Sequence, residues 1–69
     1  MSAPVTDAQL QRAISSDKDL SAASLATKIL VSRLRREVKD NPGAMGAKVA
    51  ELRAFFDKNA FAVNDLAVL

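Results

Sequence analysis

The side chains best able to bind a charged partner are five basic residues in the middle of the chain: Lys28, Arg33, Arg35, Arg36 and Lys39. Arginine and lysine contact nucleic-acid phosphates, and arginine also pairs with guanine edges. The whole chain has ten basic and eight acidic residues, a formal net charge of only +2, so overall charge is weak evidence for nucleic acid. This local cluster therefore supplies the candidate nucleic-acid contacts.

Catalytic chemistry has few candidate residues. Cysteine, histidine and tyrosine are all absent from the 69 residues. Their absence removes the usual general bases and the strongest nucleophiles. The carboxylates are scattered singly and match neither a calcium loop nor a carboxylate metal site, and no glycine pattern typical of phosphate binding occurs. We therefore expect a protein that is not an enzyme, with no cofactor, no metal and no small-molecule substrate.

A helix-start signal lies near the beginning of the chain. Thr6 and Gln9 have the spacing of a capping box, in which each side chain binds the backbone N–H of the other residue. Val5 and Leu10 have the spacing of the accompanying hydrophobic staple. The pattern predicts a first helix over about residues 6–15.

The same kind of signal recurs before the basic segment. Ser21 is expected to cap a second helix, with Leu20 and Leu25 as its hydrophobic staple. Helix-forming residues continue to position 40, where Asn-Pro-Gly ends the run because proline disfavours helical geometry in the residue before it. The second helix is therefore expected over about residues 21–40.

A third helix, over about residues 42–58, has the most regular apolar spacing. Its stripe is Met45, Val49, Leu52 and Phe56. We expect this stripe to face Leu34 and Val38 of the second helix across a tight antiparallel turn. The C-terminal segment 60–69 has two interpretations, a short fourth helix capped at Asn64 or an extended tail, and we favour the helix.

These elements predict one all-α domain spanning residues 1–69, with three helices and a short fourth as an alternative, built on an antiparallel helical hairpin. A chain of 69 residues is near the lower size limit for a self-sufficient core, and it has neither cysteine nor histidine for disulfides or zinc. Self-association or binding to a partner is the support that remains.

Part of the second helix, residues 25–38, resembles a helix-turn-helix DNA-binding unit. A leucine and an alanine are followed by Val31 and Ser32 at the end of a turn and then by basic residues on a reading helix. Leu30 stands where glycine is usual, and Arg36 and Lys39 stand where apolar residues usually pack the reading helix. The resemblance implies a DNA-binding transcriptional regulator that uses the basic segment 33–39.

The competing interpretation is one continuous amphipathic helix whose basic residues face solvent. At 100° per residue, Ala22, Leu25 and Ile29 point about 140° away from Leu34 and Val38. Either the helix breaks near residues 29–32, or its two halves pack against different elements.

An apolar surplus near the C-terminus is the second candidate surface. The residues are Phe55, Phe61, Val63, Leu66, Val68 and Leu69. They could complete the core, or they could form an exposed protein contact, and a homodimer would satisfy both interpretations. We expect a helical protein-binding module that acts as a homodimer or as an adaptor or inhibitor of a larger partner. The longest uninterrupted apolar runs are far too short to span a membrane, and with no recognisable signal segment we expect a cytoplasmic location.

Overall fold

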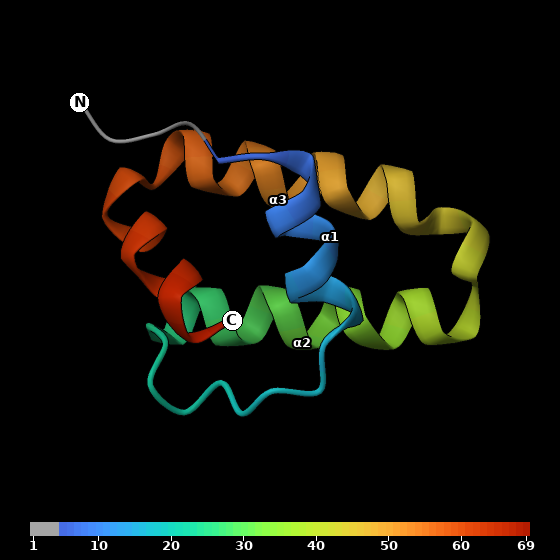
Figure 1. The fold of residues 1–69 in the computed structure, drawn as a ribbon, viewed down its shortest axis with the longest axis horizontal. Helices are drawn as coiled ribbons and strands as arrows, with labels where there is room; N and C mark the ends of the chain where they lie inside the picture. Colours follow the sequence, from blue (N-terminus) through green and yellow to red (C-terminus); the bar gives the residue numbers. More distant parts are fainter. Residues whose placement is uncertain (1–4) are drawn as a thin grey trace.

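The computed structural model describes residues 5–69, and all regular structure in that range is helical (Figure 1). In chain order the elements are α1 (Asp7–Ser15), α2 (Leu25–Asp40), the short 3₁₀ element η1 (Pro42–Ala44), α3 (Met45–Lys58) and the 3₁₀-helix η2 (Ala60–Val68). The expected all-α class is confirmed, and the C-terminal segment is helical. None of these helices combines the length and the apolar character needed to span a membrane.

Helix α1 begins where the local signal predicts. The Gln9 N–H donates to the Thr6 hydroxyl at 3.2 Å, and the Thr6 N–H donates to the Gln9 side-chain oxygen at 2.8 Å. This capping box satisfies two backbone donors that a helix start otherwise leaves free. The helix buries Leu10, Ala13 and Ile14, which share one face because they are three or four residues apart.

Helix α2 begins at Leu25, four residues later than expected. The Ser21 hydroxyl and backbone N–H both donate to the Asp19 carboxylate, at 2.7 and 3.0 Å, so Ser21 sits in a local turn rather than at a cap. The residue in the cap position is Ser24, whose carbonyl accepts the Lys28 N–H at 2.9 Å. The prediction of a cap at Ser21 was therefore wrong, because the bond from its backbone N–H to Asp19 holds the serine in a turn that is an alternative to a helix start.

No turn interrupts α2. The helix is continuous from Leu25 to Asp40, across the segment 29–32 where a helix-turn-helix unit needs its bend. The resemblance to that motif is therefore not confirmed by the backbone; the helix is unbroken, as the competing interpretation expects, but it begins at Leu25 and not at Ser21. Thr27, Val31 and Leu34 on one side of α2 are buried.

The helices pack around α1. Figure 1 shows α2 and α3 running in opposite directions, connected through η1, with α1 crossing between them. Helix α1 contacts both of its neighbours more extensively than they contact each other. The predicted stripe of α3 does face inward, with Leu52 and Phe56 buried and Met45 and Val49 partly buried. The seam is thus shared with α1 instead of being formed by α2 and α3 alone.

The C-terminal segment closes the core. It forms η2 from Ala60, earlier than the expected start at Asn64, and buries Ala62 and Leu69. The core cluster is made of small and aliphatic side chains with one phenylalanine: Leu10, Ala13, Ile14, Val31, Leu34, Leu52, Phe56, Ala62 and Leu69. Four segments thus contribute to one core.

Candidate functional site

The most exposed large apolar side chains on α2 are Leu25 and Ile29. They are 70% and 63% exposed, whereas Thr27, Val31 and Leu34 are buried on the opposite side of the same helix. Leu25 and Ile29 are four residues apart, so they lie one turn apart on one face. We use the name α2 outer face for the exposed stripe Leu25, Ile29, Ser32 and Arg36. Neither apolar residue of this stripe was among the expected contact residues.

A signal for these two residues was present in the sequence. Leu25 and Ile29 point away from Leu34 on the helical wheel, which predicted either a break or a second packing partner. The helix does not break, and within residues 5–69 the N-terminal half of this face has no partner that buries it. The periodicity therefore revealed an unsatisfied apolar face without revealing what covers it.

Most of the expected apolar contact residues pack against the protein itself. Leu69 belongs to the core and is 9% exposed, so it is not available to a partner. Phe55, Val63 and Leu66 are partly buried and pack against the core cluster, and Val68 is partly buried. Only Phe61, 64% exposed, presents most of its side chain to solvent. Most of this segment therefore lies against the core, as the core-completing interpretation expects, and a contact with a partner through these residues stays a prediction.

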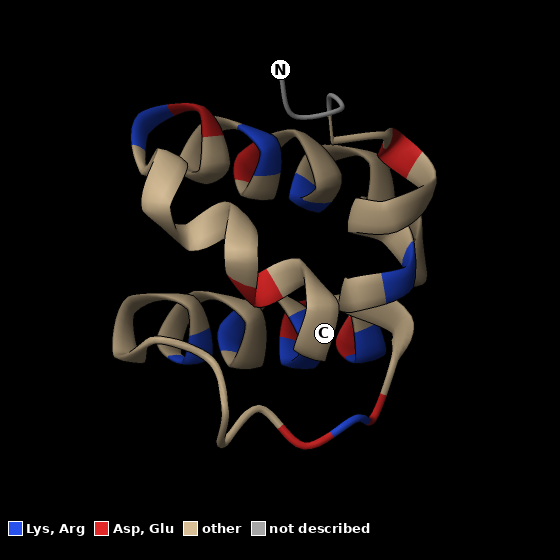
Figure 2. Ribbon diagram, turned by 60° about the vertical axis from the view of Figure 1, so that its left-hand side comes forward, with Lys and Arg blue, Asp and Glu red and all other residues tan. Residues whose placement is uncertain are grey.

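The expected nucleic-acid residues do not form one surface. Arg33 pairs with Glu37 at 3.0 Å and with Glu51 of α3, and the bond to Glu51 raises the pKa of the Arg33 guanidinium. Arg35 lies about 160° from Arg33 on the helical wheel. Figure 2 shows the basic residues of α2 spread along the helix with acidic neighbours. On the helical wheel Lys28, Arg35, Arg36 and Lys39 fall within about 100° of one another, whereas Arg33 lies apart and pairs with Glu51 of α3.

The remaining basic residues of the segment are less engaged. Within residues 5–69, Lys28, Arg36 and Lys39 take part in no ion pair. Arg36 is exposed and belongs to the α2 outer face, and Lys39 is exposed one turn further along the helix. Positive charge on this side of α2 therefore lacks a compensating carboxylate at bonding distance.

Arg35 connects α2 to α1 and to the segment that follows α1. Its Nε donates to the Ala13 carbonyl at 2.9 Å, and its Nη1 donates to the Lys18 carbonyl at 2.8 Å. Both acceptors are backbone oxygens near the C-terminal end of α1, where the helix dipole favours a cation. Burial lowers the pKa of Arg35 because the guanidinium loses solvent. Its Nη2 is buried without a hydrogen-bond acceptor among the described residues.

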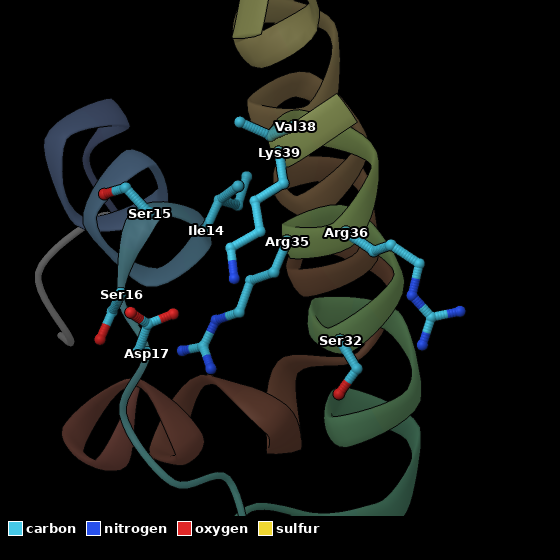
Figure 3. A pocket seen from close by; sticks show the side chains of 9 residues that line it. All are labelled: Ile14, Ser15, Ser16, Asp17, Ser32, Arg35, Arg36, Val38 and Lys39. Carbon is cyan, nitrogen blue, oxygen red and sulfur yellow. The ribbon is translucent and has the colours of Figure 1, made fainter. Parts of the chain in front are cut away.

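A pocket of about 480 Å³ lies beside Arg35, between α1 and α2. The lining residues are Ile14, Ser15, Ser16, Asp17, Ser32, Arg35, Arg36, Val38 and Lys39. Figure 3 shows the side chains of Arg35 and Lys39 extending from α2 toward Asp17 and the end of α1, whereas the Arg36 guanidinium points away. The pocket therefore has two cations and one carboxylate around its interior.

The N-terminus of α2 receives a carboxylate from the far end of the chain. One oxygen of Asp65, in η2, accepts the hydroxyls of Ser24 and Thr27 at 2.7 and 2.6 Å. These bonds lower the pKa of Asp65, the bond to Thr27 most. A negative charge at a helix N-terminus is also stabilised by the helix dipole. Nothing in the local sequence pattern predicts this pairing.

No group of His, Cys, Asp and Glu side chains within residues 5–69 is arranged to hold a metal ion. The features that remain for recognition are the α2 outer face and the pocket beside Arg35. The chain matches no known protein-family model, and comparison with curated proteins and with solved structures gives no significant match.

Proposed function

We propose that this protein is a non-enzymatic protein-binding module that docks one helical segment of a partner on the α2 outer face. The observation that carries the proposal is the exposure of Leu25 and Ile29, 70% and 63%, on consecutive turns of one helix face. Aligned apolar side chains of this kind are the anchors of helix-in-groove recognition. Full burial of one such side chain contributes about 1.5–3 kcal/mol. Because about two thirds of each side chain is exposed, covering both would contribute about 2–4 kcal/mol to the binding free energy.

The charge around these anchors defines the kind of partner. Arg36 lies on the same face, and Lys28 and Lys39 lie near it on the wheel, all without an ion pair among residues 5–69. An amphipathic helix with leucine-like anchors and flanking carboxylates would complement this face. A second copy of the chain would bring the same cations into contact, so we assign the face to a different protein. The module then works as an adaptor or inhibitor, and we keep a cytoplasmic location as a prediction.

Paired serine variants test the proposal. L25S/I29S removes both anchors, and A22S/A26S changes two exposed alanines of the same region that are not among the four residues of the α2 outer face. Circular dichroism first establishes that both variants keep the helical fold. Affinity purification with quantitative mass spectrometry is expected to recover a protein with wild type and with A22S/A26S, and to lose it with L25S/I29S. A synthetic peptide of the acidic helix in that protein should bind wild type in calorimetry and bind R36E more weakly.

Two results would contradict the proposal. One is an identical set of captured proteins for all three forms. The other is self-association in size-exclusion chromatography with light scattering that L25S/I29S abolishes, which would assign the face to a homodimer. Nucleic-acid binding through the basic segment 33–39 is the alternative, but α2 lacks the turn on which the helix-turn-helix interpretation depended.

A further inference from the structure

The pocket between α1 and α2 contains an arginine whose orientation is fixed and whose donors are incompletely used. Two nitrogens of Arg35 are held by the carbonyls of Ala13 and Lys18, which orient the planar guanidinium. The third nitrogen, Nη2, is buried without an acceptor among residues 5–69. An unsatisfied buried donor is uncommon and calls for an explanation, such as an absent ion or ligand. The Nη2 donors and the positive charge of the guanidinium suit an oxygen of a phosphate or carboxylate.

Further donors lie around the same pocket. The side chain of Lys39 extends into the space above Arg35 (Figure 3). The Ser16 hydroxyl accepts the Lys18 N–H at 3.0 Å, so its own proton remains free to donate. Ser32 adds a second hydroxyl from the α2 side. Two cations, two hydroxyls and the single carboxylate of Asp17 thus surround one volume, so groups that can bind an oxyanion outnumber the one that repels it.

We propose that this pocket binds a small molecule through a phosphate group or an oxyanion of similar size. Its volume of about 480 Å³ is within the range of small-molecule sites, about 300–1,000 Å³, and favours a compact ligand over a polymer. The site shares Ser32 and Arg36 with the edge of the α2 outer face but does not use the apolar anchors Leu25 and Ile29, so it does not depend on the protein-binding function.

Asp17 makes the proposal sharply testable. Its carboxylate lines the pocket opposite the cations and lies near the Arg35 guanidinium (Figure 3). A bound oxyanion is repelled by Asp17 and attracted by Lys39. Neutralising Asp17 should therefore strengthen binding, and neutralising Lys39 should weaken it. Each change should be about fivefold, the effect of one unit charge at about 4 Å in a water-like environment. Both residues are exposed at the rim, so their substitution does not disturb the core.

The experiment titrates the 69-residue protein with inorganic pyrophosphate and follows backbone amides by NMR. Saturable shifts are expected at residues 15–17 and 35–39. D17N should lower Kd and K39Q should raise it, each about fivefold. The matched controls D57N and K58Q remove the same charges from exposed positions of α3 that do not line the pocket, and they should leave Kd unchanged.

Several results would overturn the proposal. These are non-saturating shifts, shifts spread evenly over the surface, or equal effects of the pocket variants and the α3 controls. A competition experiment, in which a duplex DNA oligonucleotide is added to the pyrophosphate complex, tests whether the pocket binds nucleic acid. The DNA could displace pyrophosphate, and its affinity could fall with salt concentration much more steeply than a single phosphate contact explains. That result would assign the pocket's donors to a nucleic-acid backbone instead.

Discussion

The hydrogen bonds between Asp65 and the start of α2 predict how much stability the protein loses when the charge of Asp65 is removed. Asp65 accepts the Thr27 and Ser24 hydroxyls, and Thr27 is fully buried. Hydrogen bonds to a charged group contribute about 1.5–3 kcal/mol each and neutral ones about 0.5–1.5 kcal/mol. Because D65N keeps an acceptor oxygen and removes only the charge, each of the two bonds should lose about 0.75 kcal/mol. D65N should therefore lower the free energy of unfolding by about 1.5 kcal/mol. For a domain of this size that corresponds to a fall in Tm of about 6–12 °C.

The assay is thermal and urea unfolding followed by circular dichroism, arranged as a double-mutant cycle. T27V keeps the shape of the buried side chain and removes its hydroxyl. Because the two groups bond directly, T27V and D65N should couple, so that the double variant loses less stability than the sum of the single losses. D57N is the matched control, since Asp57 is exposed and makes no side-chain hydrogen bond or ion pair with residues 5–69. Losses that add within about 0.3 kcal/mol would refute the reasoning.

The pH dependence provides an independent check on the same bond. The Thr27 and Ser24 hydroxyls lower the pKa of Asp65 in the folded protein, below its ordinary value of about 3.9. A depressed pKa means that this stabilisation is fully present above the unfolded pKa and is lost as pH falls through the folded pKa. The difference in stability between wild type and D65N should thus be constant near neutral pH and shrink below about pH 4. A difference that stays constant down to pH 2 would contradict the assignment.

Three further predictions use the same unfolding assays. G46A should stabilise the protein by about 0.5–1 kcal/mol, because Gly46 is helical and an added Cβ meets no atom within 4 Å; any destabilisation would contradict this. L52A should cost about 2–5 kcal/mol, since Leu52 is fully buried in the core cluster; a smaller loss would mean that the core is looser than described. R35Q should cost about 1–3 kcal/mol through the lost bonds to the Ala13 and Lys18 carbonyls, and hydrogen exchange should rise in residues 16–24 before it rises in α3.

Local signals in the sequence gave correct predictions where the interacting groups are neighbours in the chain. Thr6 and Gln9 are three residues apart, so their reciprocal cap forms whatever the rest of the chain does. The same pattern failed at Ser21, because Asp19 lies two residues away and its carboxylate accepts the Ser21 backbone N–H, which holds the chain in a turn. A capping pattern therefore predicts a helix start only where no nearer partner is present.

Long-range features could not be predicted from the sequence. Asp65 reaches Ser24 across 41 residues, and Arg35 reaches the Ala13 carbonyl across 22. Neither contact produces a periodic pattern in the sequence, because each contact joins a single side chain to a single group far away in the chain. On the helical wheel Arg35 belongs to a solvated basic face, whereas in the structure it holds the end of α1. The pocket beside it exists only because these segments meet, so no spacing in the sequence indicates it.

The position of α1 has a consequence for fragments of the protein. Because α1 crosses between α2 and α3 and contacts each more than they contact each other, it acts as a wedge between the two longer helices. A proteolytic nick in the segment 16–24 would leave this wedge attached only by non-covalent contacts, and the domain would become a two-chain assembly. Its integrity would then depend on concentration, with a short peptide complementing the remainder.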